Sequence, residues 1–148
     1  MTALTITLEP AATLAIVSAG MFFLTALVTG VWKWVQIMKS PTHQAHPYVD
    51  IAHRASLLYS FAAMLMGAFA ALSAWGPQVD LVATAFPLFY FAFAIATYVW
   101  HGALQDTDNQ FATRNFVSTW GMVTLVAGEF GGFVVLFAGV LVTLMGVS

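Results

Sequence analysis

Long hydrophobic runs, separated by short polar stretches, dominate this chain. Each run is longer than the ~20 mainly apolar residues that a helix needs to cross a bilayer. The pattern predicts membrane-spanning helices over residues 11–38, 53–75, 81–104 and 116–146. Pro, Gly, Asn and Asp, which helices avoid, concentrate between the runs. We therefore expect an all-α, integral membrane four-helix bundle that forms one domain over residues 1–148.

The composition agrees with a membrane location. Hydrophobic residues make up 61% of the chain and charged residues only 7%, against a soluble average of ~25% charged. The chain contains no cysteine, so disulfides, thiolate metal sites and cysteine nucleophiles are excluded, and any metal or haem depends on other side chains. The net charge of -2 and the lack of a basic run argue against nucleic acid as a partner.

The basic residues predict the orientation. Two of them end the first expected helix and the other two lie near the starts of the second and the fourth: Lys33, Lys39, Arg54 and Arg114. Lys and Arg close to helix ends stay on the cytosolic side. We expect the loops 39–52 and 105–115 in the cytosol and both termini on the opposite side. The tryptophans near the helix ends are typical of interfacial anchors: Trp32, Trp34, Trp75, Trp100 and Trp120.

His53 is the candidate metal ligand on the cytosolic side. Asp50 lies three residues before it and Arg54 follows it. An imidazole whose second nitrogen is held by a carboxylate is a good axial ligand for haem iron. A guanidinium suits a haem propionate, because it forms paired hydrogen bonds with a carboxylate. The alternative is that His53 and Arg54 only end a helix at the lipid headgroups, with Arg54 setting the topology.

The rise of 1.5 Å per residue along a helix arranges the polar side chains by depth. The second and third expected helices form an antiparallel hairpin. Counting outward from its turn gives three levels from the cytosolic side: His53 with His101, then Tyr59 with Tyr98, then Tyr90 with Glu129 and Thr25 near the membrane midplane.

Glu129 is a carboxyl inside the membrane, and such groups are costly and usually face protein. It marks either a functional site or a hydrogen bond from a protonated carboxyl to Tyr90 or Thr25. Glycines around and beyond it indicate close helix packing, within the chain or between subunits: Gly128, Gly132, Gly139 and Gly146.

Several residues of the chain match the pattern of one known family. They are the Ala52-His53 pair at the start of the second expected helix and Tyr98 on the third, with the same separation between His53 and Tyr98. The short Gly-Pro turn and the Asn/Asp-rich loop after the third helix fit as well. On these residues the chain resembles the bacterial styrene oxide isomerases, small four-helix membrane enzymes with haem b at the contacts of a trimer. Tyr59 and Tyr90 stand where that family has asparagine and aspartate.

The resemblance implies an epoxide isomerase of the bacterial inner membrane. Ferric haem b on His53 would act as a Lewis acid that opens a hydrophobic epoxide to a carbonyl compound. It implies Tyr98 and Tyr59 as catalytic residues, and Arg54 and Asp50 as residues that help to bind the cofactor. The substrate would enter from the lipid, and the expected assembly is a symmetric homo-oligomer, preferably a trimer.

Two other functions stay open from the sequence. If His53 and His101 both ligate one iron, the protein is a haem protein for electron transfer. If Glu129 and a polar stripe on one face of the third expected helix form a path, it is a small channel or transporter. The stripe consists of Tyr90, Thr97, Tyr98, His101 and Gln105.

Overall fold

The computed structural model describes residues 8–112 and 116–146, without the side chains of residues 117 and 118. It contains four α-helices: α1 (Pro10–Lys39), α2 (Pro47–Leu72), α3 (Pro77–Leu104) and α4 (Phe116–Leu144). All four are long and apolar enough to cross a membrane. The all-α class and the multi-pass integral membrane character are therefore confirmed. Arg114, one of the residues used to predict orientation, lies outside the described residues.

Proline opens each of the first three helices, and this corrects two predicted boundaries. The helices begin at Pro10, Pro47 and Pro77, whereas the second and third were expected at His53 and Leu81. The first position of a helix tolerates proline well, because its amide has no partner inside the helix and φ is already suitable. Residues 47–52 and 77–80 were therefore wrongly assigned to loops. His53 lies inside α2 and not at its start.

The start of α2 is fixed by the residue before it. His46 caps the helix, because its Nδ1 accepts a hydrogen bond from the amide of Tyr48 at 3.3 Å. The backbone N–H of His46 itself donates to Oε1 of Gln36 on α1 at 2.9 Å. The connection between α1 and α2 is therefore shorter than the expected loop 39–52 and is tied to both helices.

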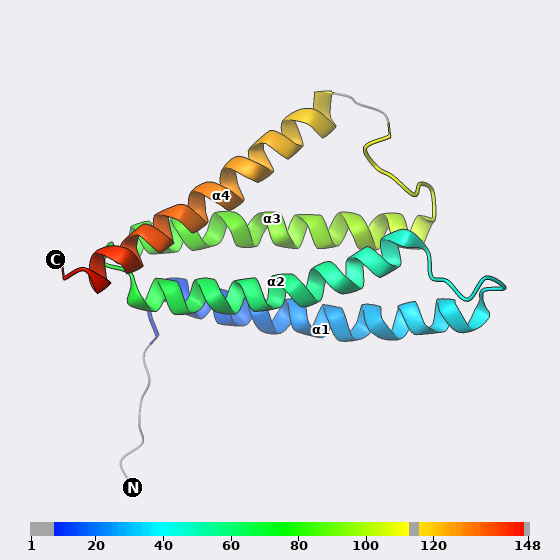
Figure 1. Cartoon of the computed structure of the whole chain (residues 1–148), viewed down its shortest axis with the longest axis horizontal. Helices are drawn as coiled ribbons and strands as arrows, with labels where there is room; N and C mark the ends of the chain where they lie inside the picture. The colour runs from blue at the N-terminus through cyan, green and yellow to red at the C-terminus, as the bar shows by residue number, and fades with distance from the viewer. Residues whose placement is uncertain (1–7, 113–115, 147–148) are drawn as a thin grey trace, which may run out of the picture.

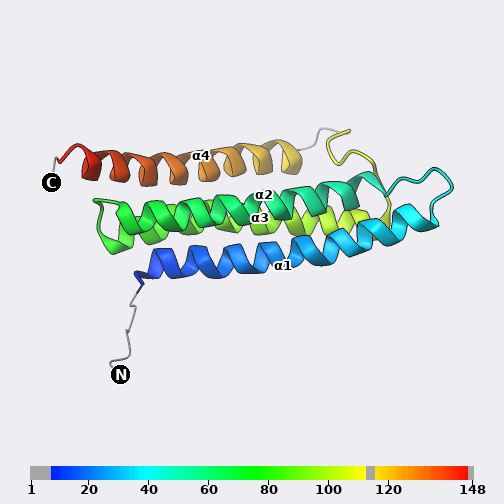
Figure 2. The same ribbon diagram turned by 60° about the horizontal axis from the view of Figure 1, so that its bottom comes forward.

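The helices form three layers, with α2 and α3 side by side in the middle (Figure 2). α1 packs on one side of this pair and α4 on the other, and α1 and α4 share no contact within the described residues. Figure 1 shows α4 inclined away from α3 toward its N-terminal end. The α1–α2 and α3–α4 connections lie at one end of the bundle, and the start of α1 and the end of α4 lie at the other.

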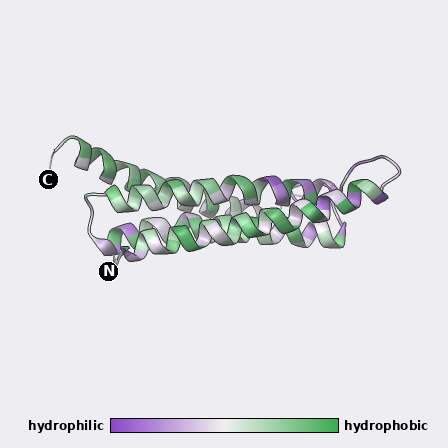
Figure 3. Cartoon of the chain, turned by 90° about the horizontal axis from the view of Figure 1, so that it is seen from below, coloured by the Kyte–Doolittle hydropathy of each residue, from purple (hydrophilic) through white to green (hydrophobic). Residues whose placement is uncertain are grey.

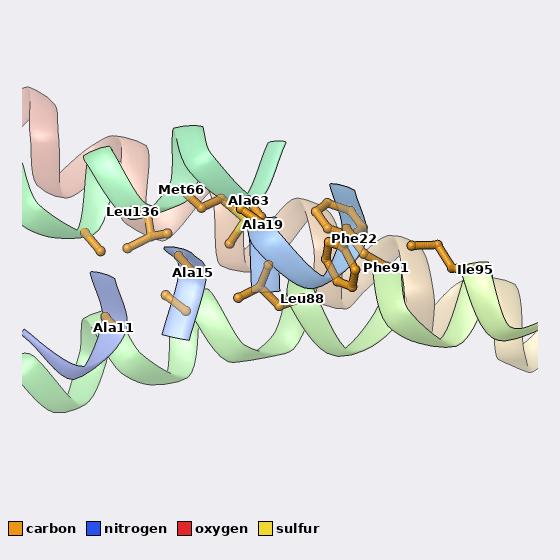
Figure 4. Packing of buried hydrophobic residues seen from close by; sticks show 12 residues of the cluster. Ala11, Ala15, Ala19, Phe22, Ala63, Met66, Leu88, Phe91, Ile95 and Leu136 are labelled. Carbon is orange, nitrogen blue, oxygen red and sulfur yellow. The ribbon is translucent and has the colours of Figure 1, made fainter. Parts of the chain in front are cut away.

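Small residues bring α1 and α2 close together. Ala11, Ala15 and Ala19 recur at every fourth position of α1 and are buried. Gly67 on α2 faces this row, and a Cβ placed there would lie 3.2 Å from the Cβ of Ala15. Between membrane helices, van der Waals packing of small residues replaces much of the hydrophobic effect. Figure 4 shows larger side chains that fill the remaining core: Phe22, Met66, Leu88, Phe91, Ile95 and Leu136.

Glycines of α4 have the same role against α3, as the sequence predicted. A Cβ at Gly132 would collide with the carbonyl oxygen of Ala83, and one at Gly128 would collide with the ring of Tyr90. Both glycines therefore allow helix contact within the chain. Gly146 differs, because it has a φ of 66° beyond the end of α4, and a Cβ placed there would meet no described atom within 4 Å. It makes no close helix contact within the described residues and occupies the left-handed conformation typical of a helix end.

The polar residues gather at the end of the bundle that carries the α1–α2 connection (Figure 3). The helices elsewhere present mostly apolar side chains, and many large ones are exposed on their outer faces. This surface is suited to lipid and not to water.

Candidate functional site

The ring of His53 is held by α1. Its Nδ1 lies 2.9 Å from the carbonyl oxygen of Ala26. Since a carbonyl only accepts hydrogen bonds, Nδ1 must carry the proton, and in the neutral ring Nε2 then has a free lone pair. The ring rests on Gly30, where a Cβ would lie 3.0 Å from Cε1 and 3.1 Å from Nδ1. α1 therefore fixes both the position and the tautomer of this imidazole.

Asp50 does not orient His53, contrary to the prediction. Its Oδ1 pairs with Nζ of Lys33 at 2.5 Å and its Oδ2 with the guanidinium of Arg54 at 2.7 Å. Because α2 begins at Pro47, Asp50 and Arg54 are neighbours one helical turn apart. The carboxylate is satisfied by these two cations. The backbone carbonyl of Ala26 takes the orienting role that the sequence assigned to the carboxylate.

Arg54, Tyr59 and Tyr98 line one groove between α2 and α3, with a volume of about 270 Å³. Tyr59 stacks on Phe91 with a centroid distance of 4.2 Å and an angle of 8° between the rings, so its orientation is fixed. The side chain of Arg54 is 65% exposed at the mouth of the groove. The structure therefore brings together the two tyrosines and the arginine that the sequence singled out.

His53 does not line this groove. The α2 residues that do, among them Ile51, Ala55 and Leu58, lie on the face of the helix roughly opposite His53, as 3.6 residues per turn requires. A single chain thus presents the imidazole on the α1 side of α2 and the tyrosines on the other side.

His101 belongs to a separate cluster at the polar end of the bundle. Its Nδ1 donates to Oδ1 of Asp106 at 2.8 Å, and this hydrogen bond holds the pKa of the Asp106 carboxyl below its usual range. The His101 ring also packs against Tyr48, with centroids 5.2 Å apart. The hydroxyl of Tyr48 accepts a hydrogen bond from the backbone N–H of Gln110 at 2.6 Å. The contacts of His101 are therefore distinct from those of His53.

The sequence reasoning missed this cluster. Tyr48 is buried, and His46 forms a further pair with Asp108 at 3.3 Å. These residues were assigned to loops, and their role depends on contacts between distant segments. Pro47 was the available signal for an early helix start, because proline is favoured at the first position of a helix.

Glu129 and Tyr90 do not meet. Tyr90 lies against Gly128 in a cavity on one side of α4, whereas Glu129 lines a different cavity between α2, α3 and α4. The Oε1 of Glu129 is buried and has no hydrogen-bond partner among the described residues. The hydroxyl of Thr25 donates to the carbonyl of Met21 within α1. The expected hydrogen bond from Glu129 to Tyr90 or Thr25 is therefore absent from the described part of the chain.

The described residues contain no cluster of three or more His, Asp or Glu side chains that could hold a metal ion. A haem needs fewer protein ligands than a bare metal ion, because a single axial histidine can hold its iron. His53 fits this use, since its tautomer is fixed by a backbone carbonyl and its ring is partly exposed.

A scan of protein-family models found no match to this chain, and searches of curated proteins and of solved structures found none either. The functional argument therefore rests on the residues and their geometry.

Proposed function

We propose that this protein is a membrane-embedded haem b isomerase that converts a hydrophobic epoxide to a carbonyl compound. The observation that carries the proposal is the state of His53. Its Nδ1 is bound to the Ala26 carbonyl, which leaves Nε2 as the ring atom suited to bind iron. When bound there, the haem supplies a Lewis acid for the epoxide oxygen.

Arg54 is suited to hold a haem propionate. Its guanidinium uses one N–H group on Asp50 and has further donors, and its side chain is 65% exposed. Asp50 in turn holds the position of Arg54 through this pair, so its contribution to cofactor binding is indirect.

Tyr59 and Tyr98 are suited to bind and orient the substrate. A phenol hydroxyl can donate a hydrogen bond to an epoxide oxygen, and that bond strengthens as the oxygen gains negative charge. The groove wall of Ile51, Ala55 and Leu58 is apolar and disfavours water, which would otherwise attack the opened epoxide. In the substrate, a C–O bond breaks, a hydride moves to the neighbouring carbon and a carbonyl forms, so no oxidant or reductant is needed.

Because His53 and the tyrosines lie on opposite faces of α2, a site that uses both would be shared between copies of the chain. This geometry agrees with the homo-trimer that the resemblance implies. We further propose that the polar end of the bundle faces the cytosol of a bacterial inner membrane, since Lys33, Lys39 and Arg54 lie there. The apolar substrate would then reach the groove directly from the bilayer.

The proposal is tested by turnover of a phenyl-substituted epoxide by the protein in detergent or liposomes, with the product identified by chromatography. We expect activity in the wild type, its loss in His53→Ala, and its retention in His43→Asn. His43 is a matched control because it is an exposed loop histidine, and asparagine tolerates its φ of 54°. Full activity in His53→Ala would refute the proposal.

The two other functions predict different results. A bis-histidine electron-transfer protein would lose its haem spectrum in His101→Ala as well as in His53→Ala. A proton channel would lose flux in liposomes when Glu129 is replaced by glutamine, whatever happens at His53.

A further inference from the structure

The carboxyl of Glu129 lies at a cavity of about 340 Å³ between α2, α3 and α4. This volume is at the lower end of the ~300–1,000 Å³ of small-molecule sites. The Oε1 atom is buried without a hydrogen-bond partner in the part of the chain that the structure describes. An unpaired carboxyl oxygen in such a place is costly, so it indicates a partner from outside the described residues.

The rest of the cavity wall is apolar and partly aromatic. Glu129 is the one titratable residue of the wall, as α2 contributes Ala, Leu and Met side chains, and α3 contributes a proline and a phenylalanine. Three phenylalanines line it: Phe91, Phe130 and Phe133. Aromatic faces attract organic cations, more strongly where water is excluded. The wall therefore combines one acid with several rings that favour positive charge.

The basic residues of the described chain do not neutralise this acid. Lys33 and Arg54 pair with Asp50 at the polar end of the bundle, and Lys39 ends α1 there. A cationic partner must therefore come from outside the described chain. The rim residues Leu65, Val126 and Phe130 are exposed on the outer face of the bundle, where lipid would lie. A ligand that dissolves in the bilayer can thus enter from the side.

We propose that this cavity binds a lipophilic organic cation, in which one ammonium group on a small apolar body pairs with the Glu129 carboxylate. A neutral apolar molecule would fill the space but leave the carboxylate unpaired, and an anion would be repelled. Protons compete with the cation for the same carboxylate, so that binding weakens as the pH falls. The cavity shares no lining residue with the groove of Tyr59 and Tyr98, and its test does not depend on haem.

The experiment uses benzyltrimethylammonium as the probe and isothermal titration calorimetry on the full chain in detergent. Neopentylbenzene is the matched neutral probe, because carbon replaces nitrogen at the same shape. We expect Glu129→Gln to weaken cation binding about 10- to 100-fold, because the amide keeps the shape of the side chain and loses the charge that attracts the cation. Glu9→Gln, which changes an exposed carboxyl at the start of α1, should bind the cation as the wild type does. Neopentylbenzene should bind the wild type and Glu129→Gln equally.

Equal binding of the cation to the wild type and to Glu129→Gln would overturn the proposal. So would binding of neopentylbenzene to the wild type with the affinity of the cation. If Glu129→Gln does not fold, Ala62→Phe gives a second test, because it fills the cavity and keeps the acid. Loss of cation binding in Ala62→Phe supports the site, and unchanged binding contradicts it.

Discussion

Replacing Gly30 by valine should displace the ring of His53, the candidate haem ligand, without changing His53 itself. The Cβ alone would lie 3.0 Å from Cε1 of the ring, and the two methyl groups of valine need further space. The ring cannot withdraw while its Nδ1 stays bonded to the Ala26 carbonyl at 2.9 Å. The substitution therefore either breaks this hydrogen bond or strains the contact between α1 and α2.

The cost can be worked out from these two contacts. Loss of the hydrogen bond costs about 0.5–1.5 kcal/mol, and overpacking a tight contact costs about 1–3 kcal/mol. Valine recovers a few tenths of a kcal/mol, roughly, through its better helix propensity than glycine. Gly20→Val is the matched control, because Gly20 is on the same helix and a Cβ placed there would meet no atom of another helix within 4 Å.

The free energy of unfolding in mixed detergent micelles, followed by tryptophan fluorescence, compares the two variants. We expect Gly30→Val to be less stable than Gly20→Val by about 0.5–3 kcal/mol, the range that the two alternative costs span. Nitrogen NMR of the His53 imidazole should show a changed tautomer balance in Gly30→Val alone. Equal stabilities together with an unchanged His53 signal would refute the described position of the ring.

Three further predictions concern packing and the polar end of the bundle. Gly132→Ala should destabilise the fold by about 1–3 kcal/mol in the same unfolding assay, because its methyl group collides with the α3 backbone, whereas Gly131→Ala should not. Equal stabilities of these two variants would contradict the contact. Trp75→Phe should cost about 0.5–1.5 kcal/mol, because its indole N–H donates to a carbonyl of α4 at 2.8 Å; wild-type stability would contradict this. The hydrogen bond with His101 lowers the pKa of Asp106 in the folded protein. This contact therefore stabilises the α3–α4 loop above the unfolded pKa of about 3.9, and the stabilisation is lost as the pH falls through the lower pKa of the folded protein. Hydrogen exchange should show a protected loop at neutral pH in the wild type but not in Asp106→Asn, and equal protection would argue against the contact.

The helices could be predicted from the sequence because the hydrophobic runs are long and the bilayer fixes the length that they need. Their starts were less predictable. Proline is favourable at the first position of a helix, but in a hydrophobic pattern it was interpreted as a loop residue. This misinterpretation of Pro47 placed His53 at the start of α2 instead of inside it. The glycines Gly128 and Gly132 were correctly interpreted as packing residues, since small residues in membrane helices have few other uses.

The candidate site was predictable only in part. Depth along the helices correctly put Tyr59 and Tyr98 together, because the rise per residue is constant. The angular position of a residue about the axis of α2 decides on which face its side chain lies, and depth along the helix carries no information about this angle. For this reason the separation of His53 from the tyrosines was not predicted, nor was the contact between the His53 ring and the backbone of α1. Contacts to backbone carbonyls leave no signature in the residue types.

The visible absorption spectrum of the protein, purified in detergent from cells supplied with a haem precursor, tests the proposed function most directly. The account predicts a Soret band in the wild type and in His43→Asn, and its loss in His53→Ala. Absence of the band from the folded wild-type protein, or a band that is unchanged in His53→Ala, would contradict the assignment of His53 as the haem ligand.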